Sequence, residues 1–262
     1  MRMKTADFIE QRAAKGSYHF TTKELSQATG VSYVAANAAL RRLRAGGRVA
    51  MPFRGFNVIV PPEYRRLGCL PADQFVPQLM AHLGLSYYAG LLTAAEYHGA
   101  AHQRPQVFQV VVEENRPQVA CGKVRVWFIA RRNVAEMPCE KRNTPRGTIE
   151  LSTPEVTAFD LVGYPLRSGG TDHVATVLSE LAGTLRPGLL ARAARLSPLP
   201  WSQRLGYLLE LLQADKVTGP LARHVAKTAR EYVPLNPKRT TAVAERSARW
   251  RLLVNEKVEP DI

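Results

Sequence analysis

Two histidines stand four residues apart in the segment YHGAAHQRPQVF, residues 97–108. On one continuous helix, His98 and His102 would present both imidazoles to a single metal ion, as in zinc sites. Gly99 lies between them, and glycine commonly ends a helix, so we expect the shared face to be lost. A zinc site would also need a third ligand, and a metalloprotease helix would carry Glu at the position of Gly99. We therefore predict a structural turn here, with no metal and no other cofactor.

Two carboxylates, Glu113 and Glu114, would suit metal-dependent hydrolysis of a phosphodiester. Restriction-type nucleases combine an acidic residue on one strand with an acidic residue and a lysine on the next, because these groups must converge on one phosphate. Glu113 and Glu114 end a predicted strand, but the next predicted strand, KVRVWFIARR at 123–132, has no acidic residue. The catalytic set is incomplete, so a metal-dependent nuclease stays an alternative, against ordinary solvated carboxylates.

Other catalytic signatures are incomplete as well. The segment RSGGTDH, residues 167–173, has paired glycines but lacks the lysine of a phosphate-binding loop, so we predict a turn before a helix capped near Thr171. Cys69, Cys121 and Cys139 are odd in number, widely spaced and without a catalytic signature. They fit structural thiols in a reducing compartment. We predict a protein that is not an enzyme.

Composition favours a polyanionic partner. Of the 262 residues, 36 are Lys or Arg and 22 are Asp or Glu, which gives a formal net charge of +14. The charge is concentrated at the start, where residues 1–66 hold 12 Lys and Arg against four Asp and Glu. No apolar run approaches the roughly 20 residues that span a bilayer. Asp7 and Glu10 interrupt the stretch that a signal peptide would need, so we expect a cytoplasmic protein without a membrane partner.

The basic N-terminal region has the element order of a winged helix-turn-helix. We predict helices over 3–15, over 19–30 with a Thr N-cap, and from Ser32 to the Gly46–Gly47 pair. A hairpin follows, with its turn at Arg54–Gly55, in the position of a wing. The alternative is a three-helix unit whose solvated basic face contacts proteins.

Helical periodicity divides the third helix into two faces. Ala36, Ala39, Leu40 and Leu43 form the buried stripe. Asn and Arg on the opposite face can bind adenine and guanine edges, so Tyr33, Asn37 and Arg41 are the predicted base readers. Cationic side chains around them are predicted to neutralise phosphate. The full predicted DNA-binding set is Lys23, Ser32, Tyr33, Asn37, Arg41, Arg42, Arg44, Arg48 and Arg54.

A second domain is predicted to follow a linker. The prolines and basic residues of VPPEYRRLGCLPAD show no period, so we predict a winged helix over 1–62, a linker over 63–73 and an α+β domain over 74–262. In that domain, strands are predicted within 106–114, 123–132 and 147–152, and helices dominate the chain after Thr153. The fold class is therefore α+β.

Several ordered blocks resemble the AbiE-family antitoxins of bacterial type IV toxin–antitoxin, or abortive-infection, systems. The blocks are YYAGLLTAAEYHGAAHQRPQVFQVVV, STPEVTAFDLVGY, GGTDHVATVLSELA, QRLGYLLE and WRLLVNEKVEPD. The resemblance implies an N-terminal winged helix that binds inverted repeats in the promoter of its own operon and represses it. It also implies a C-terminal domain that neutralises a neighbouring nucleotidyltransferase-like toxin, without a stable complex being required. No enzymatic activity and no metal are implied.

The expected partners are therefore double-stranded operator DNA and the cognate toxin. Inverted repeats require two copies on the DNA, and nothing resembles a dimerisation coiled coil, so we expect a monomer or weak dimer that pairs on the operator. Besides the nuclease, a stand-alone transcription factor that responds to a small ligand remains an alternative.

Overall fold

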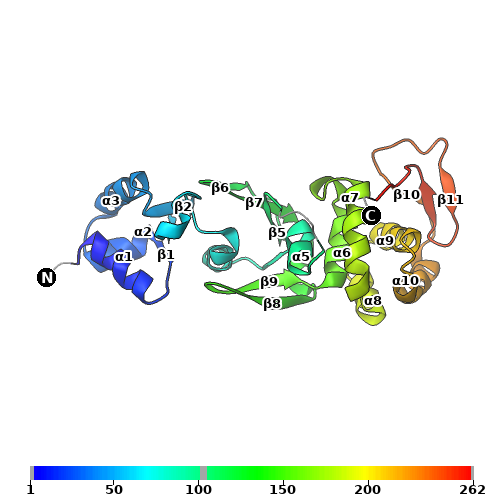
Figure 1. Cartoon of the computed structure of the whole chain (residues 1–262), viewed down its shortest axis with the longest axis horizontal. Coiled ribbons are helices and arrows are strands. Elements are labelled where there is room, and N and C mark those ends of the chain that lie inside the picture. Colours follow the sequence, from blue (N-terminus) through cyan, green and yellow to red (C-terminus); the bar gives the residue numbers. More distant parts are fainter. Residues whose placement is uncertain (1–2, 101–104, 261–262) are drawn as a thin grey trace. The chain divides into compact units, whose positions relative to one another are not determined.

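The chain folds into two compact units in a computed structural model that describes residues 3–100 and 105–260 (Figure 1). Helices and small sheets occur in both units, which confirms the α+β class. The units do not follow the predicted domains 1–62 and 74–262, because the chain passes between them several times. The first unit comprises Met1–Tyr87, Gln106–Arg132 and Lys141–Glu150, and the second comprises Tyr88–Pro105, Asn133–Glu140 and Leu151–Ile262.

The first six elements have the order and sheet of a winged helix-turn-helix. Strand β3 lies between β1 and β2, and both pairings are antiparallel. The predicted second helix is three residues too long at its start, because His19–Thr21 form a strand. The elements are α1 (Thr5–Ala14), β1 (His19–Thr21), α2 (Thr22–Thr29), α3 (Tyr33–Ala45), β2 (Val49–Phe53) and β3 (Phe56–Ile59).

A capping box fixes the start of α2 and ties it to α1. The Thr21 hydroxyl accepts a hydrogen bond from the Glu24 amide at 3.1 Å, and the Glu24 carboxylate accepts one from the Thr21 amide at 2.6 Å. The same carboxylate lies 2.6 Å from the Arg12 guanidinium of α1. Gly30 ends α2 in the left-handed conformation, as the sequence predicts.

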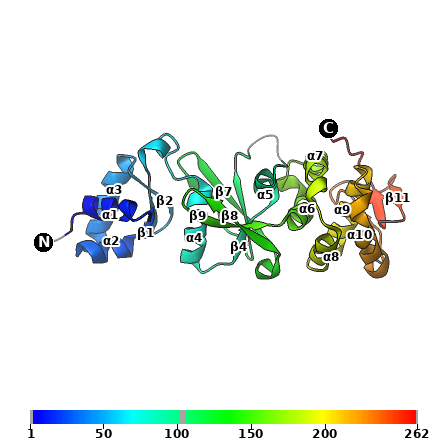
Figure 2. The same cartoon turned by 60° about the horizontal axis from the view of Figure 1, so that its bottom comes forward.

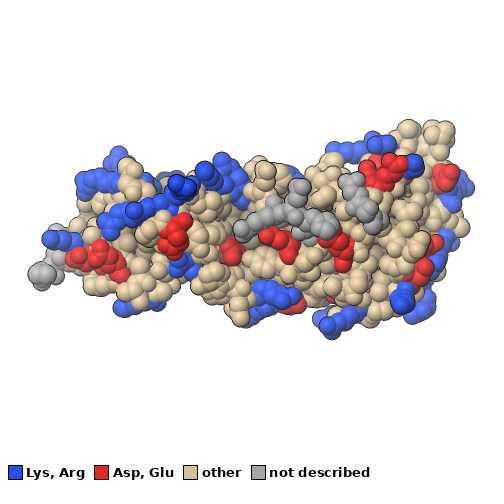
Figure 3. Space-filling view, viewed as in Figure 1, with Lys and Arg blue, Asp and Glu red and all other residues tan. Residues whose placement is uncertain are grey.

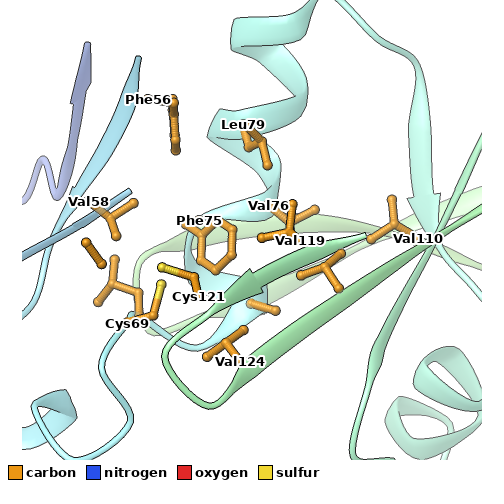
Figure 4. Packing of buried hydrophobic residues seen from close by; sticks show 14 of the residues in the cluster. Phe56, Val58, Cys69, Phe75, Val76, Leu79, Val110, Val119, Cys121 and Val124 are labelled. Atoms are coloured by element: carbon orange, nitrogen blue, oxygen red, sulfur yellow. The ribbon is translucent and has the colours of Figure 1, made fainter. Parts of the chain in front are cut away.

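Strand β3 is buried on both faces, so the wing sheet belongs to two hydrophobic cores. Ile59 packs with Phe8 and Leu40 in the core of the three helices. Phe56 and Val58 belong to the other core, which Figure 4 shows. That second core is built from segments that follow the winged helix.

The second core joins the wing sheet to a helix and a three-stranded part of a sheet. Strand β5 (Phe108–Val112) pairs in parallel with β7 (Val124–Ala130), and β6 (Val119–Cys121) pairs antiparallel with β7. Helix α4 (Val76–Leu83) contributes Val76 and Leu79. Cys69, Leu70 and Ala72 are also buried in it. Part of the predicted linker 63–73 is therefore packed in this core, while its Arg65 and Arg66 are exposed.

Arg146 holds three segments of the first unit together. It stands in the turn between β8 (Cys139–Thr144) and β9 (Gly147–Ser152). Its guanidinium carbon lies 3.6 Å from the ring centroid of Tyr18, its Nε donates to Gln74 at 2.8 Å, and its Nη2 lies 3.4 Å from Glu63. The flat guanidinium thus stacks on an aromatic ring, while its charged N–H groups pair with a carboxylate and an amide oxygen.

The second unit is mainly helical and is organised around α6, in which Glu155–Val162 are all buried (Figure 2). Helix α6 packs against α5, α7, α8 and α9. Trp250 fills the space above Gly206, where a Cβ would lie 2.0 Å from the indole. The elements are β4 (Tyr87–Ala89), α5 (Leu91–Tyr97), α6 (Pro154–Gly163), α7 (Thr171–Leu181), α8 (Pro187–Arg195), α9 (Leu199–Leu211), α10 (Asp215–Thr228), β10 (Val233–Pro234), β11 (Glu245–Ser247) and β12 (Leu252–Val254).

The predicted helices after Thr153 are confirmed. The Thr153 hydroxyl caps α6 at the amide of Val156, with Pro154 in the first turn. Strands β10, β12 and β11 form a small sheet that the sequence did not predict. None of the helices in the described residues is long and apolar enough to cross a bilayer.

The capping box predicts a pH-dependent stability. Burial raises the pKa of Glu24, but hydrogen bonds from the Thr21 backbone and from Arg12 outweigh it, so the net pKa is lowered. A lowered pKa in the folded state stabilises the fold above the unfolded pKa of about 4.3, and this is lost as pH falls through the folded value. Glu24→Gln should cost about 0.5–2 kcal/mol at pH 7 in denaturant unfolding, and the difference should shrink below pH about 4.

Glu10→Gln is the matched control. Glu10 is exposed, and its ion pair with Arg48, at 3.6 Å, is a surface contact. It should change the free energy of unfolding by less than about 1 kcal/mol. An equal deficit of Glu24→Gln at pH 7 and pH 3 would contradict the role given to the carboxylate.

Removal of the Arg146 guanidinium should loosen the first unit. Arg146→Ala should lower the free energy of unfolding by about 1–3 kcal/mol, because it removes a stacked cation and two polar contacts. Arg146→Lys should recover only part of this, since an ammonium cannot stack and fork in the same way. Arg132→Ala, a change at an exposed arginine, serves as control in the same denaturant titration. Equal free energies of unfolding for Arg146→Ala and Arg132→Ala would refute the role of Arg146 in holding the three segments together.

Candidate nucleic-acid interface

Helix α3 is positioned by its cap and by one buried stripe. The Ser32 hydroxyl accepts a hydrogen bond from the Ala35 amide at 3.2 Å, which confirms it as the N-cap. Ala36 and Leu40 are fully buried, and Leu43 packs against the same core. The face of α3 opposite this stripe is consequently turned to solvent.

The predicted base readers on the outward face of α3 differ in exposure and in hydrogen bonding. Tyr33 is 53% exposed, and Arg41 is exposed. Asn37 is half-buried, and its side-chain amide donates to the Tyr33 carbonyl at 3.1 Å. One Nδ2 proton of Asn37 is therefore engaged within the helix, and its second proton and its Oδ1 are left for a base.

The wing is a hairpin whose turn is held by a hydrogen bond to α2. Gly55, at φ +80°, allows the turn, and its carbonyl accepts a hydrogen bond from the Thr22 amide at 3.0 Å. Arg54 is exposed at the tip, as predicted, and Phe53 beside it is 38% exposed. The turn thus joins the wing to the start of α2 and presents one cation.

The remaining predicted cations differ in exposure and in whether they already have a partner in the protein. Lys23 in the first turn of α2 and Arg42 on α3 are exposed. Arg44 is half-buried, with Nη1 3.0 Å from the Met51 sulfur, and Arg48 lies 3.6 Å from the Glu10 carboxylate. Arg48 is thus already used within the fold, while Lys23 and Arg42 have no ion-pair partner among the described residues.

Val34 is a candidate contact that sequence reasoning missed. It is 76% exposed in the first turn of α3, where an apolar side chain gains nothing from the protein. An apolar side chain at the start of a recognition helix can pack on a thymine methyl group. The sequence does contain a signal for it, because Val34 is an apolar residue outside the buried stripe of Ala36 and Leu40.

His98 is engaged in the structure of the second unit. Its side chain is 3% exposed, and its Nε2 lies 2.8 Å from the Ser152 carbonyl oxygen, which joins the end of α5 to β9. Gly99 follows with φ +77°, and α5 ends at Tyr97, as the sequence indicates. His102 lies outside the described residues. Within the described residues, no three His, Cys, Asp or Glu side chains gather in a way that could hold a metal.

The other groups considered for chemistry are dispersed. Glu113 and Glu114 are exposed after the end of β5. Cys69 and Cys121 are buried side by side, and their mutual hydrogen bond, together with burial, raises the pKa of the Cys69 thiol. Cys139 is half-buried. A raised pKa disfavours the nucleophilic thiolate, so Cys69 is suited to packing.

Comparisons with known proteins identify the middle of the chain. Residues 88–211 match the family model of the AbiEi antitoxin C-terminal domain. The crystal structure of the RV2827C protein from Mycobacterium tuberculosis is similar, with a TM-score of 0.64 over 97% of this chain and 92% of that chain. At 17% identity this likeness shows a shared fold alone. No curated protein matches the sequence. Residues 88–211 thus resemble the C-terminal domain of the AbiEi antitoxins.

Proposed function

We propose that this antitoxin binds inverted-repeat DNA in the promoter of its own operon, represses that operon and counteracts a nucleotidyltransferase-like toxin. The observation that carries the DNA-binding part is the exposed basic face of α3 beside a wing of fixed geometry. The match to the AbiEi antitoxin domain supports the antitoxin part.

In this proposal, α3 enters the major groove and reads bases. Arg41 contributes a guanidinium that can bind guanine O6 and N7, and Asn37 an amide that suits adenine. Tyr33 and Val34 stand in the first turn of α3, and both are exposed. They supply apolar surface for the base edges, while Lys23, Arg42 and Arg54 neutralise phosphates.

The charge of the chain determines how binding should depend on salt. A net charge of +14 favours association with any duplex, and each neutralised phosphate releases counterions. Specificity must therefore come from the base contacts of α3 and not from affinity alone. Two copies of the chain occupy the two halves of the inverted repeat.

Toxin neutralisation is assigned to the AbiEi domain, without catalysis by this chain. The buried His98 and the protonated Cys69 are engaged in packing and hydrogen bonding. The match of residues 88–211 to the AbiEi antitoxin domain supports a regulator that opposes a toxin encoded beside it. The DNA-reading and neutralising roles are thus carried by different residues, which makes them separable by mutation.

Arg41→Ala and Arg54→Ala should have different effects on binding. Arg41→Ala should cost roughly 1–3 kcal/mol on operator DNA and little on random DNA, because it removes a base contact. Arg54→Ala should weaken both duplexes alike, because it removes a phosphate contact. Titration of each variant with both duplexes at one fixed salt concentration provides the test. An equal loss on operator and random DNA for Arg41→Ala would eliminate the base-reading role.

Rescue of growth should separate the two roles. Expressed from an independent promoter, the wild-type chain should restore growth of cells that express the nucleotidyltransferase-like toxin encoded beside it. Arg41→Ala should rescue equally well, because its damage is confined to DNA reading. The measurement is colony formation under toxin induction, with protein levels matched by immunoblot.

Failure of the wild-type chain to rescue would contradict the antitoxin role and favour a stand-alone transcription factor. The nuclease alternative has its own outcome. Nicking of plasmid DNA in Mg²⁺ or Mn²⁺ by the purified chain, abolished in Glu113→Ala, would replace the non-catalytic account.

A further inference from the structure

Four cations outside the winged helix are exposed in the first unit. Arg65 and Arg66 follow the short helix at Pro62–Tyr64, and Lys123 and Arg125 stand at the β6–β7 hairpin. Among the described residues none of the four has a carboxylate partner, in contrast to Arg12, Arg48 and Arg146 of the same unit. Like charges that are neither buried nor paired indicate a surface made for an anionic partner.

Close backbone contact holds these two pairs of cations together. The Lys123 amide donates to the Leu67 carbonyl at 2.7 Å. A Cβ at Gly122 would lie 2.2 Å from that carbonyl oxygen and 2.8 Å from the Cα of Gly68. Only glycine at both positions permits this approach, so the hairpin tip and the segment 65–68 form one basic ridge of Arg65, Arg66, Lys123 and Arg125.

The basic ridge continues the surface of α3. Arg44 of α3 lies against the sulfur of Met51 in β2. Strands β2 and β6 are in contact. Figure 3 shows Lys and Arg gathered over α3, β2 and the β6–β7 hairpin. The second hydrophobic core beneath makes this surface one body within the first unit.

We propose that the basic ridge binds phosphates of the duplex that flanks the site read by α3. This inference rests on the proposed DNA binding and extends it to residues beyond the winged helix. A duplex carries one negative charge per about 1.7 Å of its axis, so a cationic surface continuous with a recognition helix meets the backbone of the same DNA. Because the ridge lies outside the recognition helix, we assign its contacts to phosphates, which add affinity and register but no sequence preference.

The test compares two duplexes and three variants of the full chain by fluorescence anisotropy at several salt concentrations. The short duplex ends at the inverted repeat, and the long one extends by about ten base pairs, one helical turn, on each side. The ridge variant is R65Q/R66Q/K123Q/R125Q. The control, K216Q/R223Q/K227Q/R230Q, removes the same charge from exposed positions on and after α10.

On the long duplex, the ridge variant should bind roughly 10–100-fold more weakly at low salt, with a salt slope smaller by roughly 2–4, since each phosphate contact contributes about 0.9. Its preference for operator over random DNA should be unchanged, and the short duplex should be affected much less. R65Q/R66Q leaves the hairpin intact and should reduce the slope by roughly half as much.

An unchanged slope, or an equal loss in the control, would overturn the ridge. Loss of binding to single-stranded RNA with duplex binding intact would overturn it as well. If the wild-type chain bound operator and random DNA equally, base reading would fail, while the slope on random DNA would still decide the ridge.

Discussion

The burial of strand β3 on both faces is the constraint on which the first unit of the molecule depends. Its Phe56 and Val58 belong to the core under α4 and β5–β7, and its Ile59 belongs to the core of the three helices. Phe56 and Val58 are nearly inaccessible to water, and each such side chain contributes about 1.5–3 kcal/mol when buried. The wing sheet is therefore a shared wall, and the winged helix is continuous with the segments that follow it.

This shared wall has a functional consequence. A recognition helix on a flexible tether would search for its site independently of the rest of the chain. Here α3, the wing and the β6–β7 hairpin are held by one body, so cations from residues far apart in sequence keep a fixed arrangement. Arg146 adds a polar clamp on the same body, through Tyr18 and Gln74. Preorganised cations lose less conformational freedom on binding.

Local sequence signals predicted the helices well. Ser32, Thr21 and Thr153 each cap a helix through a side-chain hydrogen bond, and these residues are informative because capping is a short-range interaction. The outward face of α3 followed from its buried stripe. Periodicity could not predict the hydrogen bonds that the side chains of α3 make within the protein, such as the one from Asn37 to the Tyr33 carbonyl.

Long-range pairing explains what the sequence did not predict. Strands β1 and β4 have three residues each, too few for a period, and they pair with strands far along the chain. The segment 63–73 has the composition of a linker, but Cys69 is buried by a hairpin some fifty residues later. The basic ridge was hidden for the same reason, since only the Gly68–Gly122 contact brings its two halves together.

Hydroxyl-radical footprinting of the full chain on the promoter of its own operon is the most direct test of DNA reading by α3 and the basic ridge. We expect protection of both halves of an inverted repeat, with protected backbone extending beyond each half-site. Uniform protection along the promoter, or none at concentrations that bind random DNA, would contradict it.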